Sequence, residues 1–125
     1  MSEADQARLL LTGNPEIINM IPAVVQAKVV PHFLYRHYVK LKKQDFKKYF
    51  VESDYVGQKL DDHLKHPLHN GLHIIAMPNG SFEAQMLERG EPFETTQLAD
   101  RDALNNFLID QIYLSHHLDA RLDKR

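Results

Sequence analysis

Hydrophobic and polar positions change their spacing several times along the chain, and the first thirty residues are typical of short helices. Ser2 can cap a helix that ends near Leu11, because its side chain can accept a hydrogen bond from a free backbone N–H. Asn14-Pro15-Glu16 is a typical start of a second helix, with a capping amide before proline at the first helical position. Pro22 interrupts this helix, and Pro31 ends the following stretch. We therefore predict that residues 1–30 are helical.

From His32 to Lys42 the spacing changes to alternation, which is typical of a β-strand with one buried face. The odd-numbered positions would share the buried face, and the basic residues would face water. A helix remains open for the same stretch, because it would group Leu34, Tyr38 and Leu41.

The residues that follow, Gln44–Phe50, are expected to form one or two helical turns. Together with the preceding strand, their pattern Asp45-Phe46-x-x-Tyr49-Phe50 resembles the opening of a dimeric α/β-barrel subunit. The resemblance covers residues 33–50 alone, so we take from it no function and no site residue.

The sequence before the next proline predicts a further helix. Ser53 or Asp54 can cap it, and Pro67 ends it. Val56, Leu60 and Leu64 recur along it at helical spacing, which predicts that these three side chains form its apolar stripe.

Two alternating segments on either side of a turn sequence predict a β-hairpin. Leu72–Met77 and Ser81–Leu87 flank Pro78-Asn79-Gly80, in which proline presets one dihedral angle and Asn-Gly tolerates positive φ. After a turn at Arg89-Gly90-Glu91-Pro92, a further strand is expected over Phe93–Gln97.

The last part of the chain predicts one long helix, capped by Asp100 and extending to about Arg121. Its apolar face is so wide that it needs two neighbours, which are its own sheet and a second copy of the chain. Alternatively, a single chain covers the whole face. The candidate interface residues are Phe107, Ile109, Tyr113, Leu114 and Leu118.

These elements predict a single α+β domain over residues 1–125, a length that fits one domain. It would consist of N-terminal helices, a small antiparallel sheet of about four strands with a central hairpin, and a long C-terminal helix packed on the sheet.

Composition and charge narrow the function classes. The chain has 43% hydrophobic residues and no cysteine, so disulfides, thiolate metal sites and cysteine nucleophiles are excluded. Its 15 basic and 17 acidic residues nearly cancel. The acidic start lacks the features of a secretory signal, and polar residues interrupt the apolar stretch Leu9–Val30. We therefore expect a cytoplasmic protein that does not bind membranes.

Histidines provide the clearest candidate chemistry. Four of the eight lie close together in the sequence, beside two aspartates. Imidazole and carboxylate are ligands for zinc, manganese or iron, and three of them around one ion leave a position for a catalytic water. Alternatively, the imidazoles are solvated or bind the last carbonyls of the helix. The candidate ligands are His63, His66, His69 and His73, supported by Asp61 or Asp62.

A second candidate site is the basic, aromatic segment from residue 36 to residue 48. Cations bind phosphates and aromatic rings stack on bases, so this mixture is found in proteins that bind nucleic acid. A solvated basic face over a buried aromatic core would give the same pattern. The candidate contacts are Arg36, Lys40, Lys42, Lys43, Lys47 and Lys48.

Taken together, these features favour a small protein-interaction or regulatory module without catalytic activity, which forms a homodimer or binds another protein. The alternative is a metal-dependent enzyme or metal-binding protein that uses the histidine cluster. Otherwise no cofactor is expected. Nucleic-acid binding ranks below both, because the net charge is −2.

Overall fold

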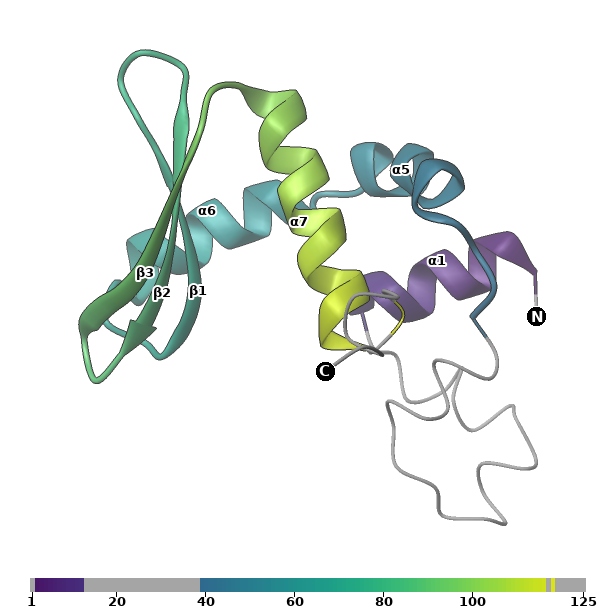
Figure 1. Ribbon diagram of the computed structural model, residues 1–125, viewed down its shortest axis with the longest axis horizontal. Helices are drawn as coiled ribbons and strands as arrows, with labels where there is room; N and C mark the ends of the chain where they lie inside the picture. Colours follow the sequence, from purple (N-terminus) through teal and green to yellow (C-terminus); the bar gives the residue numbers. More distant parts are fainter. Residues whose placement is uncertain (1, 13–38, 117, 119–125) are drawn as a thin grey trace, which may run out of the picture. The chain divides into compact units, whose positions relative to one another are not determined.

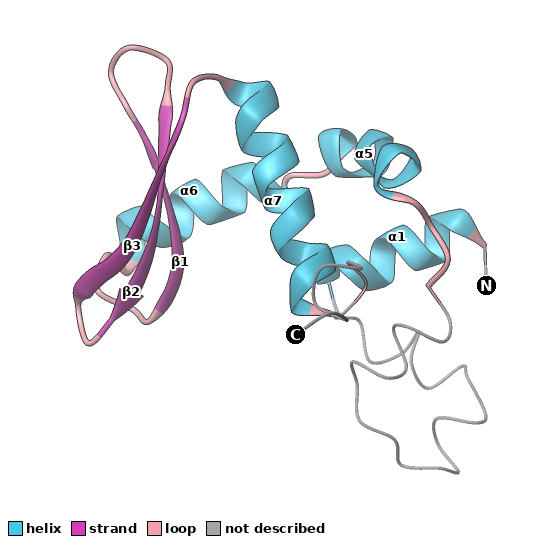
Figure 2. Ribbon diagram, viewed as in Figure 1, coloured by secondary structure: helices cyan, strands magenta, loops and turns pink. Residues whose placement is uncertain are grey.

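The computed structural model describes residues 2–12, 39–116 and 118. These residues form an α+β fold with four helices and three antiparallel strands (Figures 1 and 2). The α+β class is confirmed, with three strands in the described residues where about four were predicted. The second predicted helix lies outside the described residues. In chain order, the elements are α1 (Glu3–Thr12), α5 (Lys43–Glu52), α6 (Tyr55–Lys65), β1 (Gly71–Ala76), β2 (Phe82–Glu88), β3 (Glu91–Leu98) and α7 (Arg101–Ser115).

The chain divides into two compact units. One is the continuous stretch 53–107, here called the sheet unit, and the other combines residues 1–52 with residues 108–125 and is called the terminal unit. The residues of α7 are shared, with the first half in the sheet unit and the second half in the terminal unit. The prediction was that residues 1–125 fold as a single domain, and this stays a prediction.

The predicted hairpin between β1 and β2 is confirmed. The strands are antiparallel, with Ile74 opposite Ala84. In the connecting loop the N–H of Gly80 donates to the carbonyl of Met77 (3.2 Å), and the N–H of Met77 donates to the carbonyl of Ser81 (2.9 Å). Gly80 has a φ of 85°, a value that glycine adopts at little cost and that this three-residue loop requires.

The next turn is tighter than predicted. Arg89 and Gly90 have φ angles of 53° and 79°, the positive values of a two-residue type I′ turn whose twist suits a hairpin. Strand β3 therefore begins at Glu91 and includes Pro92, so the assignment of both residues to the turn was wrong. Proline is tolerated here because β3 is at the edge of the described sheet, and the register shifts beside it, between Met86 and Leu87.

Both faces of β1 are covered. His73 and Ile74 point to opposite faces, and they are only 5% and 0% exposed. Helix α6 packs along β1 (Figure 1), and Ala84 continues the apolar face of Ile74 on β2. The first half of α7, in which Leu104 is fully buried, packs with the sheet in the same unit. Beyond β2, most of β3 is exposed, Leu98 being buried.

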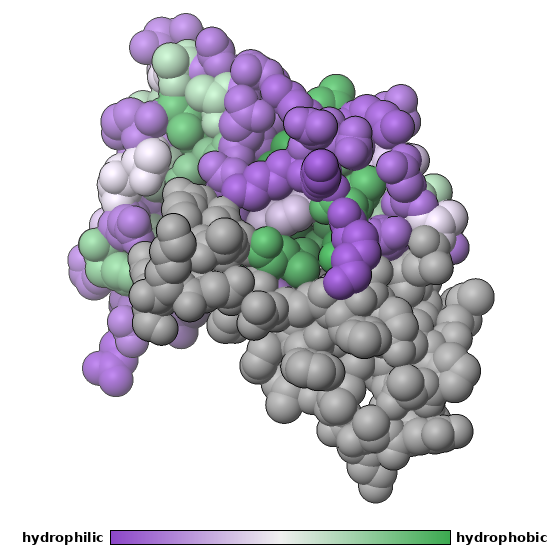
Figure 3. Space-filling view, turned by 45° about the vertical axis from the view of Figure 1, so that its right-hand side comes forward, coloured by the Kyte–Doolittle hydropathy of each residue, from purple (hydrophilic) through white to green (hydrophobic). Residues whose placement is uncertain are grey.

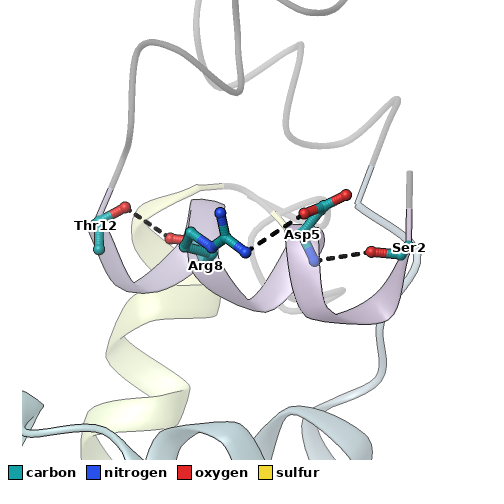
Figure 4. A network of polar contacts seen from close by, with 4 residues as sticks. All are labelled: Ser2, Asp5, Arg8 and Thr12. Atoms are coloured by element: carbon teal, nitrogen blue, oxygen red, sulfur yellow. Dashed lines mark hydrogen bonds and ion pairs between the residues drawn. The ribbon is translucent and has the colours of Figure 1, made fainter.

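Helix α1 in the terminal unit begins as the sequence predicts (Figure 4). The side-chain oxygen of Ser2 accepts a hydrogen bond from the N–H of Asp5 (3.1 Å), as expected of an N-cap residue. Arg8 forms an ion pair with Asp5 (3.7 Å). In the last turn the hydroxyl of Thr12 donates to the carbonyl of Arg8 (2.8 Å), and the helix ends there.

Residues 39–42 lead into α5 without forming a strand, so that part of the predicted strand is wrong; residues 32–38 lie outside the described residues. The side-chain carbonyl of Gln6 accepts hydrogen bonds from the N–H groups of Lys40 (2.7 Å) and Leu41 (2.9 Å). The hydroxyl of Tyr113 donates to the carbonyl of Leu41 (2.6 Å). These bonds occupy the groups that a neighbouring strand would pair with. The alternation nevertheless persists, since Val39 and Leu41 are buried and Lys40 is exposed.

Helix α7 is capped as predicted but ends earlier. The carboxylate of Asp100 accepts a hydrogen bond from the N–H of Ala103 (2.8 Å). The last helical residue is Ser115, where the sequence predicted an end near Arg121. The N–H of Leu118 reaches back to the carbonyl of Tyr113 (2.8 Å), a bond that closes a helix C-terminus. Among the described helices, none is long and apolar enough to cross a membrane.

Candidate functional site

Two of the four candidate histidines meet between α6 and β1. The Nδ1 atoms of His63 and His73 are 3.0 Å apart, and their rings are nearly perpendicular, at 85°. Seven residues separate His63 from the buried Val56, so the two side chains lie within about 20° of each other around the helix. The same helix face thus carries an aliphatic contact at its start and an imidazole at its end.

A backbone carbonyl fixes the proton positions in this pair. The Nε2 atom of His73 is 2.6 Å from the carbonyl oxygen of His69. A carbonyl oxygen only accepts hydrogen bonds, so Nε2 of His73 carries a hydrogen, and the tautomer with its single hydrogen there has a free lone pair on Nδ1. The hydrogen between the two Nδ1 atoms then belongs to His63, which donates to His73.

The other two histidines form a separate pair. The rings of His66 and His69 are stacked, with centroids 4.5 Å apart and planes at 5°, and both residues are exposed. All four histidines line one hollow of about 360 Å³ together with Asp62. Within residues 2–12, 39–116 and 118, no group of three or more histidine, aspartate or glutamate side chains is placed to hold a metal ion. The predicted ligands thus gather as two pairs around one hollow.

Two side chains of α6 have shifted pKa values, His63 at the hollow and Lys65 on the exposed side of the helix. Burial lowers the pKa of His63, and the neighbouring His73 lowers it further, so His63 is neutral at pH 7. Asp61, which was a candidate ligand, forms an ion pair with Lys65 (2.8 Å) on the exposed side of α6. This hydrogen bond and the negative charge of Asp61 raise the pKa of Lys65.

Large hydrophobic side chains lie exposed at one end of the sheet. Leu64, Leu68 and Phe93 are 78%, 70% and 63% exposed, and we call these three residues the sheet-end surface. The prediction that Leu64 lies in the apolar stripe of its helix was wrong, and the exposure of Leu68 and Phe93 was not predicted. Leu64 is about 80° from Val56 around the helix, whereas His63 is only about 20° away, so His63 takes the inward position. On the face drawn in Figure 3, hydrophobic residues show in separate areas between hydrophilic ones.

The predicted interface residues of α7 divide into two groups. Ile109 and Tyr113 are 3% and 4% exposed, so they belong to the core of the protomer. In the terminal unit the ring of Tyr113 packs against that of Phe46, with centroids 5.8 Å apart. The remaining three, Phe107, Leu114 and Leu118, are half-buried. Contact of this helix with a second chain stays a prediction.

Several lysines of the basic segment are paired within the terminal unit. Lys43 forms an ion pair with Asp110 (2.9 Å), and Lys48 approaches Glu3 (3.8 Å). Lys40, Lys42 and Lys48 are exposed, Lys43 and Lys47 are half-buried, and Arg36 lies outside the described residues. Lys43 and Lys48 thus have charged partners within the same chain. Binding of nucleic acid by residues 36–48 stays a prediction.

Comparison with protein-family models, with curated proteins and with solved structures finds no match to this chain. The function is therefore inferred from the chain's own residues and their arrangement.

Proposed function

We propose that this protein is a non-catalytic protein-interaction module that self-associates as a homodimer through the sheet-end surface. The proposal rests on the exposure of Leu64, Leu68 and Phe93, each more than 60% accessible. Water-exposed leucine and phenylalanine side chains that cluster at one place are typical of protein-interaction sites.

The three residues come from segments that meet at one end of the sheet. Leu64 is on the last turn of α6, and Leu68 is in the loop that leads from α6 into β1. A Cβ atom built on Gly90, in the turn between β2 and β3, would lie 3.7 Å from a methyl carbon of Leu68. The N–H of Arg89 in the same turn donates to the side chain of Asn70 (2.8 Å), which ties this loop to the turn. Phe93 follows the turn on β3.

A second copy of the chain is the occupant that the energetics favour. Burying one leucine or phenylalanine side chain contributes about 1.5–3 kcal/mol, so three contribute about 4.5–9 kcal/mol, against an association cost of about 4–15 kcal/mol. A two-fold contact buries the same surface twice and doubles the gain. Exposed charges of both signs surround the surface, so two copies can pair opposite charges. These charges are Lys65, Glu88, Arg89, Glu91 and Glu94.

We expect the two copies to contact each other through side chains, and not by pairing their β3 strands into one continuous sheet. β3 is at an edge of the described sheet, and an unprotected edge strand can pair with a strand of another chain. Pro92 has no N–H to donate, and the register shift beside it leaves Phe93 as an extra residue in the ladder. Both features are ones that proteins use to prevent edge pairing.

The test is the mass in solution, measured by light scattering across a range of concentrations, for wild type and for Leu68→Asp. Wild type is expected to dimerise and Leu68→Asp to stay monomeric with an unchanged circular dichroism spectrum. Val51→Asp is the matched control, because Val51 is 57% exposed and lies in the other unit. A monomeric wild type at every concentration contradicts the proposal. So does a dimer that survives Leu68→Asp but is lost in Leu114→Lys, which would favour the interface on α7.

A further inference from the structure

We propose that His63 and His73 form a binding site for a divalent transition-metal ion such as Zn²⁺, which takes the place of the hydrogen between their Nδ1 atoms. This site is independent of the proposed self-association. It differs from the four-histidine cluster predicted from the sequence in that His66 and His69 are not ligands.

The separation of the two nitrogen atoms suits a shared ion. Zinc binds imidazole nitrogen at about 2.0–2.1 Å, so two such nitrogens around one ion are about 2.9 Å apart at a right angle and about 3.3 Å apart at the tetrahedral angle. The Nδ1 atoms of His63 and His73 are 3.0 Å apart. The two rings therefore need to separate by only a few tenths of an ångström to bind an ion between them.

His73 is already oriented as a ligand. Its Nε2–H is held by the carbonyl oxygen of His69 at 2.6 Å, which directs the free lone pair of Nδ1 toward His63. Histidine ligands of metal ions commonly donate their second ring N–H to a carbonyl, because this fixes both the tautomer and the ring orientation. His73 is also only 5% exposed, so its neighbours hold the ring in place.

His63 supplies the second ligand through a change of tautomer. In the pair without metal its hydrogen is on Nδ1, and on binding this hydrogen moves to Nε2 through solvent, so the neutral imidazole keeps its charge. Both His63 and His73 line the hollow, which gives water and the ion a route to the pair. Among the described residues no third histidine or carboxylate converges on the pair, so water fills the remaining positions.

The two imidazole ligands determine which metal ions the site prefers. Two neutral imidazoles favour zinc, copper or nickel over the harder calcium and magnesium ions, which prefer oxygen ligands. Asp62 and Lys59, which carry opposite charges, also line the hollow. His66 and His69 form their own pair, in which the two rings stack face to face with their centroids 4.5 Å apart.

The test is titration of the full chain with Zn²⁺ at neutral pH, followed by NMR of the histidine ring nitrogens. Saturable binding is expected, with large shifts at Nδ1 of His63 and His73 and small shifts in His66 and His69. His63→Ala is expected to weaken Zn²⁺ binding at least about tenfold, because the loss of a group that merely supports a ligand already costs about that much affinity. His66→Ala and His69→Ala are expected to change the affinity less than about twofold.

The variants and the spectra together decide the outcome. His63 is only partly buried, so His63→Ala should keep its circular dichroism spectrum, and the wild-type shifts do not depend on any variant. Absence of saturable Zn²⁺ binding overturns the proposal. A loss of binding in His66→Ala or His69→Ala with none in His63→Ala also overturns it, and Mg²⁺ competing as well as Zn²⁺ would do the same.

Discussion

Replacing Gln6 by leucine tests how the terminal unit holds residues 39–42. The side-chain oxygen of Gln6 accepts two backbone N–H groups, those of Lys40 at 2.7 Å and Leu41 at 2.9 Å, and Gln6 is 8% exposed. Leucine fills similar space but accepts no hydrogen bond. Each buried N–H left without a partner costs about 1–3 kcal/mol. Because the Lys40 group is only partly buried, we expect Gln6→Leu to lower the free energy of unfolding by about 2–4 kcal/mol.

Urea denaturation followed by circular dichroism measures this loss. Hydrogen exchange measures it locally, since about 1.4 kcal/mol corresponds to a tenfold faster exchange of the Leu41 amide. Gln44→Leu is the matched control, because Gln44 is exposed and the same change there should stay within about 0.5 kcal/mol. A loss below about 1 kcal/mol in Gln6→Leu, or unchanged exchange at Leu41, would refute the assigned role.

Four further predictions follow from single contacts, and each is measured by urea or thermal unfolding unless stated otherwise. Tyr113→Phe keeps the ring contact with Phe46 but loses the hydroxyl bond to Leu41, which should cost about 1–2 kcal/mol; no loss would contradict it. Burial, together with the charge of Asp45, raises the pKa of Tyr113, so the folded state keeps its proton where the unfolded chain ionises. Stability should therefore fall as the pH rises above about 10, the unfolded value, and this fall should be smaller in Tyr113→Phe. Arg89→Asn should stabilise by about 0.5–1 kcal/mol, because asparagine tolerates positive φ better. Asp100→Ala should cost about 1 kcal/mol by removing the cap of α7, and a cost near zero would show that solvent caps the helix equally well.

The helix caps and the hairpin loop could be predicted from the sequence, because they depend on residues close together along the chain. Ser2 and Asp100 cap their helices because each accepts an N–H three residues ahead. Pro78-Asn79-Gly80 forms the hairpin loop because proline presets one dihedral angle and Asn-Gly tolerates positive φ. In each case the interacting groups lie within a few residues of each other.

Features decided by distant contacts were not predicted. The backbone of residues 39–42 alternates like a strand, but Gln6 is 34 and 35 residues from the two N–H groups that it binds. The hydroxyl of Tyr113 is 72 residues from the carbonyl that accepts its hydrogen bond. No local pattern reveals such partners.

The candidate site shows the same division. The sequence identified the four histidines as a group, and the structure places them around one hollow. Which of them meet depends on how α6 lies against β1, and this position brings together His63 and His73, ten residues apart. The exposed Leu64 was missed for the related reason that one residue along a helix turns a side chain by about 100°.

The division of the chain into two units has a consequence for synthesis on the ribosome. Residues 53–107 are continuous and can complete the sheet unit as soon as they have emerged, whereas the terminal unit needs residues from 108 onward. Gln6 and Leu41 are thus made early but wait for Tyr113, whose hydroxyl completes their network. When residue 107 has emerged and residue 108 has not, the sheet unit is complete, while Phe46 still lacks the ring of Tyr113 that packs against it.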